Sequence, residues 1–268
     1  MTRTPVIVGG GSWGSALATA LQATGQTPVV LVRNAETVRL LATGRCRQLA
    51  DLPPVSPIRA TTDPAILGEA GLVFLVVPVS ATAAALAQVV QHAGSPDALV
   101  LCAKGMAMTE DGAALMPELA GSLVPKLPAV ILSGPSFADE VMAGLPAAVT
   151  AAGTDEAAVA TVQDSFAGSH LRVYANTDPL GVAIGGTMKN VIAIAAGCAI
   201  GLGLGDTGGD RTDTNLGDEF GVNPCVDVSV LEVVYELREV LNRINVVVWG
   251  RGYEADARGS APCFRDFR

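Results

Sequence analysis

A glycine-rich turn near the start of the chain has the spacing of a phosphate-binding loop. Gly9, Gly11 and Gly14 fit the pattern GxGxxG, between an apolar run at 6–8 and an alanine-rich stretch at 15–23. In such a loop the first glycine makes a tight turn, the second lets a pyrophosphate approach the backbone, and the third lets helix and strand pack closely. The amides at the helix start then face the anion. We therefore predict a dinucleotide site here. A glycine turn with a purely structural role is the alternative.

An arginine follows the second apolar run, residues 28–32. NAD-specific sites usually place Asp or Glu at this point to hold the ribose 2′-hydroxyl, whereas arginine suits a 2′-phosphate. Arg33 therefore favours NADP over NAD as the cofactor. The alternative is an ordinary exposed arginine.

The chain has only three lysines, and two of them lie in motif-like segments. Lys104 follows the apolar run 98–102, and Lys189 lies in an otherwise apolar helical stretch, where an unpaired charge is costly. A positioned ammonium can stabilise negative charge that develops on a carbonyl oxygen and can supply a proton. The alternatives are a surface lysine at a strand end for Lys104 and a buried, paired lysine for Lys189. Lys126 is expected to be solvated.

Short apolar runs alternate with alanine-rich stretches over the first two-thirds of the chain, and the polar or glycine-rich turns follow the runs. The runs predicted to be strands are 6–8, 28–32, 72–77, 98–102, 130–132, 147–151 and 171–174. Residues 15–23 and 82–91 are predicted helices. This alternation is typical of an α/β fold with a doubly wound, Rossmann-type sheet, which binds ligands beyond the carboxyl ends of its strands.

The character of the sequence changes near residue 180. Residues 182–199 are rich in small side chains and predict one long buried helix. We expect a dinucleotide-binding domain over 1–180 and the start of a mostly helical, incomplete substrate domain over 181–268. Within it, residues 207–268 are atypical, because they contain no lysine and a higher density of charged residues than the rest of the chain.

Composition excludes several classes of protein. The chain has 268 residues, 50% hydrophobic and 16% charged, so it is neither disordered nor a disulfide-stapled mini-protein. A net charge of −9 argues against a general nucleic-acid binder. Five cysteines without a CxxC pair favour free thiols in a reducing compartment over a disulfide frame, and two histidines argue against a metal site. The glycine-interrupted run 191–204 is too short to span a bilayer, and no signal peptide is evident, so we expect a soluble cytoplasmic protein.

Four further segments are more specific than the glycine loop. They are Val77-Pro78 with Ser80, Lys104-Gly105-Met106, Ser133-Gly134-Pro135-Ser136-Phe137-Ala138-Asp139-Glu140, and Gly185-Gly186-Thr187-Met188-Lys189-Asn190-Val191-Ile192-Ala193-Ile194-Ala195-Ala196-Gly197 followed by Gly201-Leu202-Gly203-Leu204-Gly205-Asp206. With the N-terminal loop they resemble the bacterial-type NAD(P)-dependent sn-glycerol-3-phosphate dehydrogenases over about residues 4–206.

The resemblance implies an activity and a set of site residues. Such enzymes interconvert dihydroxyacetone phosphate and sn-glycerol 3-phosphate for glycerophospholipid synthesis, and a homodimer is a candidate assembly. Lys189 would be the catalytic lysine and would touch the substrate together with Lys104, Gly134 and Ser136. The dinucleotide, NADP or NAD, would be bound by Gly9, Gly11, Ser12, Trp13, Gly14, Arg33, Lys104 and Ala138. For Ser136, capping of the following helix is the alternative role.

The resemblance stops after Asp206. The family continues with an Asn-Ala-Arg segment and a helical domain, in which a Ser-Arg-Asn segment supplies an arginine that helps to hold the substrate phosphate. Residues 207–213 differ from the first segment, and the second is not found. A shifted reading frame or a replaced C-terminus would explain this, and the alternative function is then an inactive homologue that at most binds a dinucleotide. A ketopantoate or 3-hydroxyacid reductase is a third reading, since it shares the glycine loop but not Ser-Gly-Pro-Ser-Phe-Ala.

Overall fold

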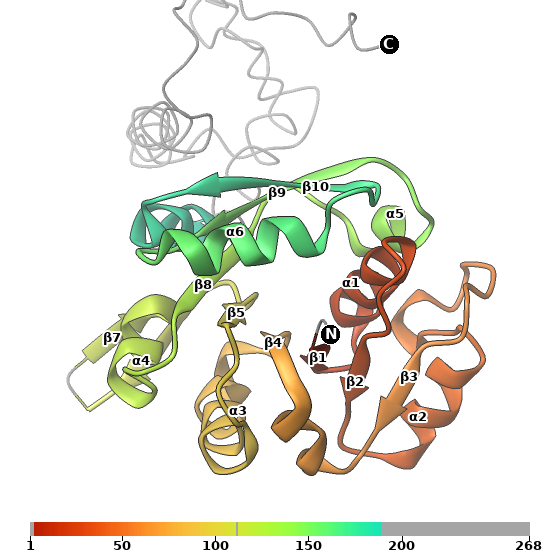
Figure 1. Ribbon diagram of the computed structural model, residues 1–268, viewed down its shortest axis with the longest axis horizontal. Coiled ribbons are helices and arrows are strands. Elements are labelled where there is room, and N and C mark those ends of the chain that lie inside the picture. Colours follow the sequence, from red (N-terminus) through yellow and green to blue (C-terminus); the bar gives the residue numbers. More distant parts are fainter. Residues whose placement is uncertain (1–2, 111, 189–268) are drawn as a thin grey trace, which may run out of the picture. The chain divides into compact units, whose positions relative to one another are not determined.

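The apolar runs form one eight-stranded sheet in the computed structural model, which describes residues 3–110 and 112–188 (Figure 1). The strand order is β10-β9-β8-β5-β4-β1-β2-β3. The strands are β1 (Thr4–Val8), β2 (Val29–Leu31), β3 (Arg59–Thr61), β4 (Ala70–Leu75), β5 (Ala98–Leu101), β8 (Ala129–Ser133), β9 (Ala147–Ala152) and β10 (Leu171–Asn176). Neighbours from β3 to β8 are parallel, whereas β9 runs antiparallel to β8 and pairs in parallel with β10.

Side chains alternate between the two faces of the sheet along each strand. Since both faces carry apolar side chains, helices cover both of them. The helices are α1 (Ser12–Ala23), α2 (Ala35–Ala42), α3 (Val79–His92), α4 (Met116–Leu123), α5 (Ala138–Met142) and α6 (Glu156–Ser165), with short 3₁₀ turns η1 (Arg47–Leu49) and η2 (Pro64–Glu69). One core cluster joins Ile7 and Phe74 to α1, α5 and α6. The other joins Val8 and Leu75 to α3 and α4. Every residue of β4 is buried, as its continuous apolar run requires.

The prediction of a Rossmann-type α/β fold is confirmed. Each of the seven predicted strands overlaps an observed one, and the predicted helices 15–23 and 82–91 lie within α1 and α3. The sequence patterns did not predict the three-residue edge strand β3 or the antiparallel hairpin of β6 (Met106–Thr109) and β7 (Gly112–Leu115). Residues 179–188 are helical, in agreement with the start of the helix predicted at 182–199. The rest of that helix and residues 207–268 lie outside the described residues, and the domain boundary at residue 180 stays a prediction.

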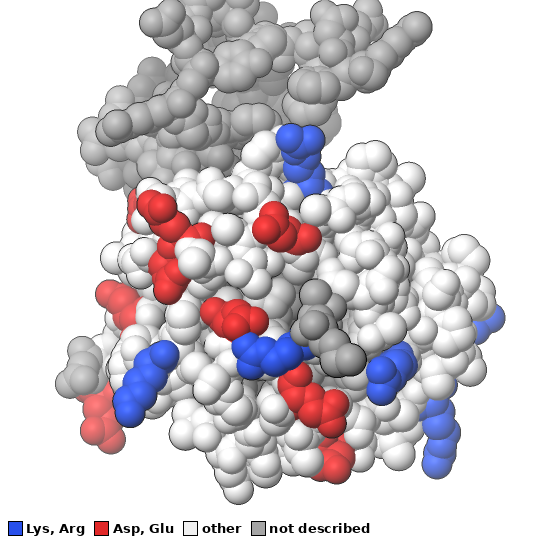
Figure 2. All heavy atoms as spheres, viewed as in Figure 1, with Lys and Arg blue, Asp and Glu red and all other residues white. Residues whose placement is uncertain are grey.

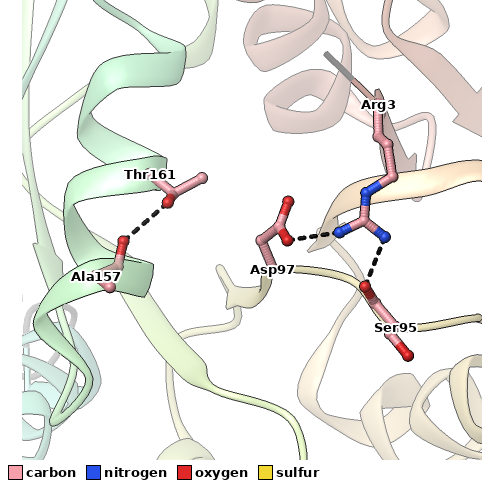
Figure 3. Close-up of polar contacts among 5 residues, drawn as sticks. All are labelled: Arg3, Ser95, Asp97, Ala157 and Thr161. Carbon is pink, nitrogen blue, oxygen red and sulfur yellow. Dashed lines mark hydrogen bonds and ion pairs between the residues drawn. The ribbon is translucent and has the colours of Figure 1, made fainter. Parts of the chain in front are cut away.

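An ion pair ties together the amino ends of two strands. Arg3, just before β1, contacts the Asp97 carboxylate at 2.5 Å and donates to the Ser95 carbonyl oxygen at 2.6 Å, both just before β5 (Figure 3). The same view shows Thr161 donating to the Ala157 carbonyl within α6, at 2.8 Å. Because the Arg3 and Asp97 side chains are 44% and 53% exposed, we expect the pair to add at most about 1 kcal/mol.

The charged side chains of the described part are interspersed rather than gathered by sign on the face shown in Figure 2. No helix among the described residues is long and apolar enough to cross a membrane.

Candidate functional site

A cavity of about 480 Å³ opens where four parallel strands end. Its walls come from the segments that follow β1, β4, β5 and β8. Between β1 and β4 the chain order reverses, since β2 lies on one side of β1 and β4 on the other. Such a switch point leaves a crevice at the carboxyl edge of an open α/β sheet, and ligands bind there. The lining residues are Gly11, Ser12, Trp13, Gly14, Val76, Val77, Pro78, Val79, Cys102, Ala103, Lys104, Leu132, Ser133, Gly134, Ser136 and Ala138.

The three glycines of the loop differ in what surrounds them. Gly9 has φ +118°, and a Cβ there would lie 2.2 Å from the Val76 carbonyl oxygen. A Cβ on Gly14 would lie 1.9 Å from the Gly9 carbonyl oxygen. By contrast, nothing lies within 4 Å of a Cβ built on Gly11. Gly9 and Gly14 are therefore required for the turn and its packing, whereas Gly11 leaves open space beside the cavity.

Helix α1 presents its amino end to this cavity. Gly11 is its N-cap and supplies no side-chain hydrogen bond, and the first turn carries no acidic residue. Ser12 and Trp13, the first two helical residues, line the cavity. The first amides of a helix have no intrahelical partner, and the helix dipole adds partial positive charge there. The geometry suits an anion such as a pyrophosphate.

Arg33 lies beside the glycine turn but does not line the cavity. It is exposed, two residues beyond the end of β2, and makes no hydrogen bond or ion pair with the residues that the structure describes. The turn is bound to the same strand end, because the Gly9 amide donates to the Leu31 carbonyl oxygen at 3.0 Å. Arg33 is thus placed near the turn with a guanidinium available to a ligand.

The segments that follow β5 and β8 contribute Lys104 and a glycine-containing loop to the cavity. The Lys104 Nζ lies 3.5 Å from the Gly134 carbonyl oxygen, which it approaches as a donor. Gly134 packs against the next strand so closely that a Cβ would lie 2.9 Å from Val149 Cα. Ser136 lines the cavity, and its amide donates to the Gly134 carbonyl at 3.1 Å. The alternative role for Ser136 is wrong, because the N-cap of α5 is Phe137.

The helical segment 179–188 packs against these segments. A Cβ on Gly186 would lie 2.9 Å from Ser133 Oγ and 3.7 Å from Lys104 Cγ. A Cβ at this position would therefore crowd the Ser133 hydroxyl, whereas its distance to Lys104 is an ordinary van der Waals contact. Lys189 follows this segment and lies outside the described residues, so its contacts are not part of this geometry.

Cys102 is a buried thiol in the cavity wall, directly after β5. Burial raises the pKa of Cys102 from 9.0 to about 12, although a hydrogen bond with the Trp13 side chain and the nearby charge of Lys104 act in the opposite direction. The thiol is therefore neutral at physiological pH.

The structure brings most of the expected site residues together. Eight of them line the cavity: Gly11, Ser12, Trp13, Gly14, Lys104, Gly134, Ser136 and Ala138. Gly9 shapes the turn, and Arg33 lies beside it. Cys102 and Ser133 also line the cavity but were not among the predicted site residues. Their positions at the carboxyl ends of predicted strands could have indicated them. The described residues contain no group of three or more His, Cys, Asp or Glu side chains that could hold a metal ion.

Two family models match the chain. They describe the N-terminus of NAD-dependent glycerol-3-phosphate dehydrogenase, matched by residues 6–159, and its C-terminus, matched by residues 178–210. The second match covers the segment in which the resemblance was expected to end.

Individual relatives agree with these matches. The chain is 40% identical over 209 residues to glycerol-3-phosphate dehydrogenase (NAD(P)+) of Acidiphilium cryptum, a match that covers 77% of this chain and 63% of that protein. Identity to the enzyme of Mesorhizobium japonicum is 38% over 227 residues, covering 81% and 66%. A crystal structure of glycerol-3-phosphate dehydrogenase from Coxiella burnetii superposes with a TM-score of 0.68 at 31% identity, covering 77% of this chain and 63% of that one. The chain spans slightly less than two-thirds of these relatives.

Proposed function

Since the chain belongs to the NAD-dependent glycerol-3-phosphate dehydrogenase family, we propose that it interconverts dihydroxyacetone phosphate and sn-glycerol 3-phosphate with NADP or NAD. The observation that carries the proposal is the cavity at the switch point of the sheet, which is lined by both the amino end of α1 and Lys104. The helix end suits an anionic dinucleotide, and the lysine suits an oxyanion or phosphate.

The residues present fit a dinucleotide. Gly11 leaves open space where a pyrophosphate would approach the backbone, and the first turn of α1 carries no carboxylate to repel it. Ser12, Trp13 and Ala138 would border the bound group, with Gly9 and Gly14 maintaining the turn. When bound, the dinucleotide supplies or accepts the hydride of the reaction.

Two lysines would bind the substrate and transfer the proton. Lys104 would attract the anionic substrate and border both substrate and dinucleotide, with Gly134 and Ser136 on the same wall. Lys189 would be the catalytic lysine: its ammonium would donate a proton to the carbonyl oxygen as the carbon is reduced, and the neutral amine would take the hydroxyl proton back in the reverse direction. The assignment of Lys189 rests on the family motif and on the match over residues 178–210.

Arg33 supports a preference for NADP. Its guanidinium is exposed beside the turn that would hold the pyrophosphate, and arginine pairs well with a phosphate in a bidentate manner. In the cell, we propose that the product feeds glycerophospholipid synthesis in the cytoplasm. The free cysteines Cys46 and Cys102 fit such a reducing compartment. A homodimer is the assembly that we propose, and analytical ultracentrifugation of the purified chain would test it.

The experiment is the initial rate of NADPH oxidation with dihydroxyacetone phosphate. We expect turnover that falls about 10²- to 10⁴-fold in Lys189→Ala, whereas Lys126→Ala, which removes an exposed lysine, should retain the wild-type rate. Ketopantoate and a 3-oxoacid, tested in parallel, should be poor substrates. A folded protein without turnover, or one that Lys189→Ala leaves unchanged, would contradict the proposal.

A further inference from the structure

The hydroxyl group of Ser133 lies at the carboxyl edge of the sheet, where the cavity opens. Ser133 is the last residue of β8, is half-buried and lines the cavity. Its backbone is held in the sheet, because Ser133 pairs with Thr150 of the antiparallel strand β9. Its side chain makes no hydrogen bond with the residues that the structure describes. A hydroxyl group can donate one hydrogen bond and accept two, so this one can serve a ligand in the cavity.

A helical segment packs against the face of β8 to which Ser133 points. Side chains alternate along a strand, so Ile131 and Ser133 share a face. Ile131 lies in one core cluster with Val182 of the segment 179–188. Two residues along a strand and four along a helix both advance about 6–7 Å, so Gly186 is expected beside Ser133. A Cβ on Gly186 would lie 2.9 Å from Ser133 Oγ, in agreement with this register.

The absence of a side chain at Gly186 keeps the space beside the Ser133 hydroxyl open. The same Cβ position lies 3.7 Å from Lys104 Cγ, so the hydroxyl group and the lysine stem both lie within 4 Å of one point. The Lys104 Nζ in turn lies 3.5 Å from the carbonyl oxygen of Gly134, the residue after Ser133. A neutral hydroxyl group and an ammonium group therefore border the same part of the cavity.

The three polar groups of dihydroxyacetone phosphate differ in the partners that they need. The phosphate is anionic and the carbonyl oxygen gains negative charge as the carbon is reduced, so both suit the ammonium groups of Lys104 and Lys189. The hydroxymethyl group is neutral, and it both donates and accepts hydrogen bonds. An ammonium group can only donate, whereas the Ser133 hydroxyl can do both. Ser133 is thus the better partner for the hydroxymethyl group.

Two other serines line the cavity, but their positions suit this role less well. Ser12 is the first residue of α1, at the helix end that would hold the pyrophosphate. Ser136 lies between β8 and α5, outside the pairing that holds Ser133 in the sheet. A hydroxyl group on a paired strand residue is held more precisely than one on a loop.

We propose that Ser133 is a substrate-binding residue that determines specificity: its hydroxyl group binds the hydroxymethyl group of dihydroxyacetone phosphate. The inference deepens the proposed function and rests on it for the identity of the substrate. It adds a contact through which the protein distinguishes this substrate from a phosphorylated methyl ketone.

The test measures kcat/KM for dihydroxyacetone phosphate and for hydroxyacetone phosphate, in which a methyl group replaces the hydroxymethyl group. Ser133→Ala removes only the hydroxyl group. Ser122→Ala is the matched control, because Ser122 lies in α4, donates to the Leu119 carbonyl oxygen at 2.9 Å and does not line the cavity. The calorimetric Kd for NADPH reports separately on the dinucleotide site.

We expect Ser133→Ala to lower kcat/KM for dihydroxyacetone phosphate about 3- to 10-fold, the size of one neutral hydrogen bond. The value for hydroxyacetone phosphate should stay at that of the wild type, because this substrate has no hydroxyl group for Ser133 to bind. The preference for dihydroxyacetone phosphate should therefore shrink by the same factor. The Kd for NADPH should not change, and Ser122→Ala should match the wild type in every value.

Three results would overturn the inference: an unchanged kcat/KM for dihydroxyacetone phosphate in Ser133→Ala, an equal loss for both substrates, or the same change of preference in Ser122→Ala. An equal loss would mean that Ser133 supports the structure of the site and does not read the hydroxymethyl group. Failure of the proposed function has a different signature. In that case the wild-type protein itself would reduce neither substrate, and the inference would fall with it.

Discussion

Among the residues that the structure describes, Lys104 has the most direct role in the proposed reaction, because its positive charge would attract the anionic substrate. It lies at the cavity wall near the Gly134 carbonyl, and its aliphatic stem packs near Gly186. Lys104→Met preserves the stem and removes the charge, so we expect kcat/KM for dihydroxyacetone phosphate to fall about 10²- to 10³-fold. Initial rates at several substrate concentrations measure this. Lys126→Met, an exposed lysine elsewhere, is the control, and an equal loss in both variants would refute a site role for Lys104.

Arg33 should decide between the two dinucleotides. Its guanidinium would meet the 2′-phosphate of NADP but has no such partner in NAD. Arg33→Ala should therefore weaken NADPH binding about 10-fold, the size of a hydrogen bond to a charged group, and leave NADH binding almost unchanged. Calorimetric titration with both dinucleotides gives the ratio. Arg39→Ala, on the following helix, is a suitable control. Equal weakening of both dinucleotides would contradict the assignment.

Cys102 should make stability depend on alkaline pH. Burial raises the pKa of this thiol from 9.0 to about 12. Between these values the unfolded chain loses the thiol proton while the folded protein keeps it, so the free energy of unfolding should fall as pH rises, by up to about 1.4 kcal/mol per pH unit. Urea unfolding between pH 8 and 11 should show a shallower fall in Cys102→Ala than in the wild type. Parallel curves would contradict a buried neutral thiol.

At the scale of elements, two glycines of the β1–α1 turn have different roles: Gly14 is needed for packing, and Gly11 leaves room for a ligand. Gly14→Ala would place a Cβ against the Gly9 carbonyl, and we expect it to lower the free energy of unfolding by about 1–3 kcal/mol. Gly11→Ala meets nothing within 4 Å and should cost less than about 1 kcal/mol, yet it should weaken NADPH binding about tenfold or more, because a methyl group would stand where the pyrophosphate approaches. Chemical denaturation and calorimetry distinguish the two effects. A stable Gly11→Ala variant with wild-type affinity would contradict the loop assignment.

The sequence patterns predicted some elements better than others for physical reasons. The runs at 6–8 and 72–77 were clear because β1 and β4 are central strands buried on both faces. The edge strand β3 is only three residues long and begins with an exposed arginine, so it has no apolar signature. The antiparallel direction of β9 is a property of pairing with β8, which no local pattern encodes.

At the scale of the whole molecule, the site is a product of topology. Strand order brings the segments after β1, β4, β5 and β8 to one edge, so that Trp13 and Lys104, distant in sequence, border the same cavity. Motif spacing could locate the glycine loop, Lys104 and Ser136, because each follows a strand. It could not reveal that Trp13 and Cys102 line the same cavity, which depends on how α1 and β5 are placed by the sheet.

We propose that this chain moves a hydride between a nicotinamide and carbon 2 of a three-carbon phosphate. The most direct measurement is mass spectrometry of the product formed from dihydroxyacetone phosphate and NADPH that carries deuterium on the transferable position of nicotinamide carbon 4. We expect sn-glycerol 3-phosphate with one deuterium at carbon 2 and none in the Lys189→Ala reaction. A folded, NADPH-binding wild-type protein that forms no labelled product would contradict the account.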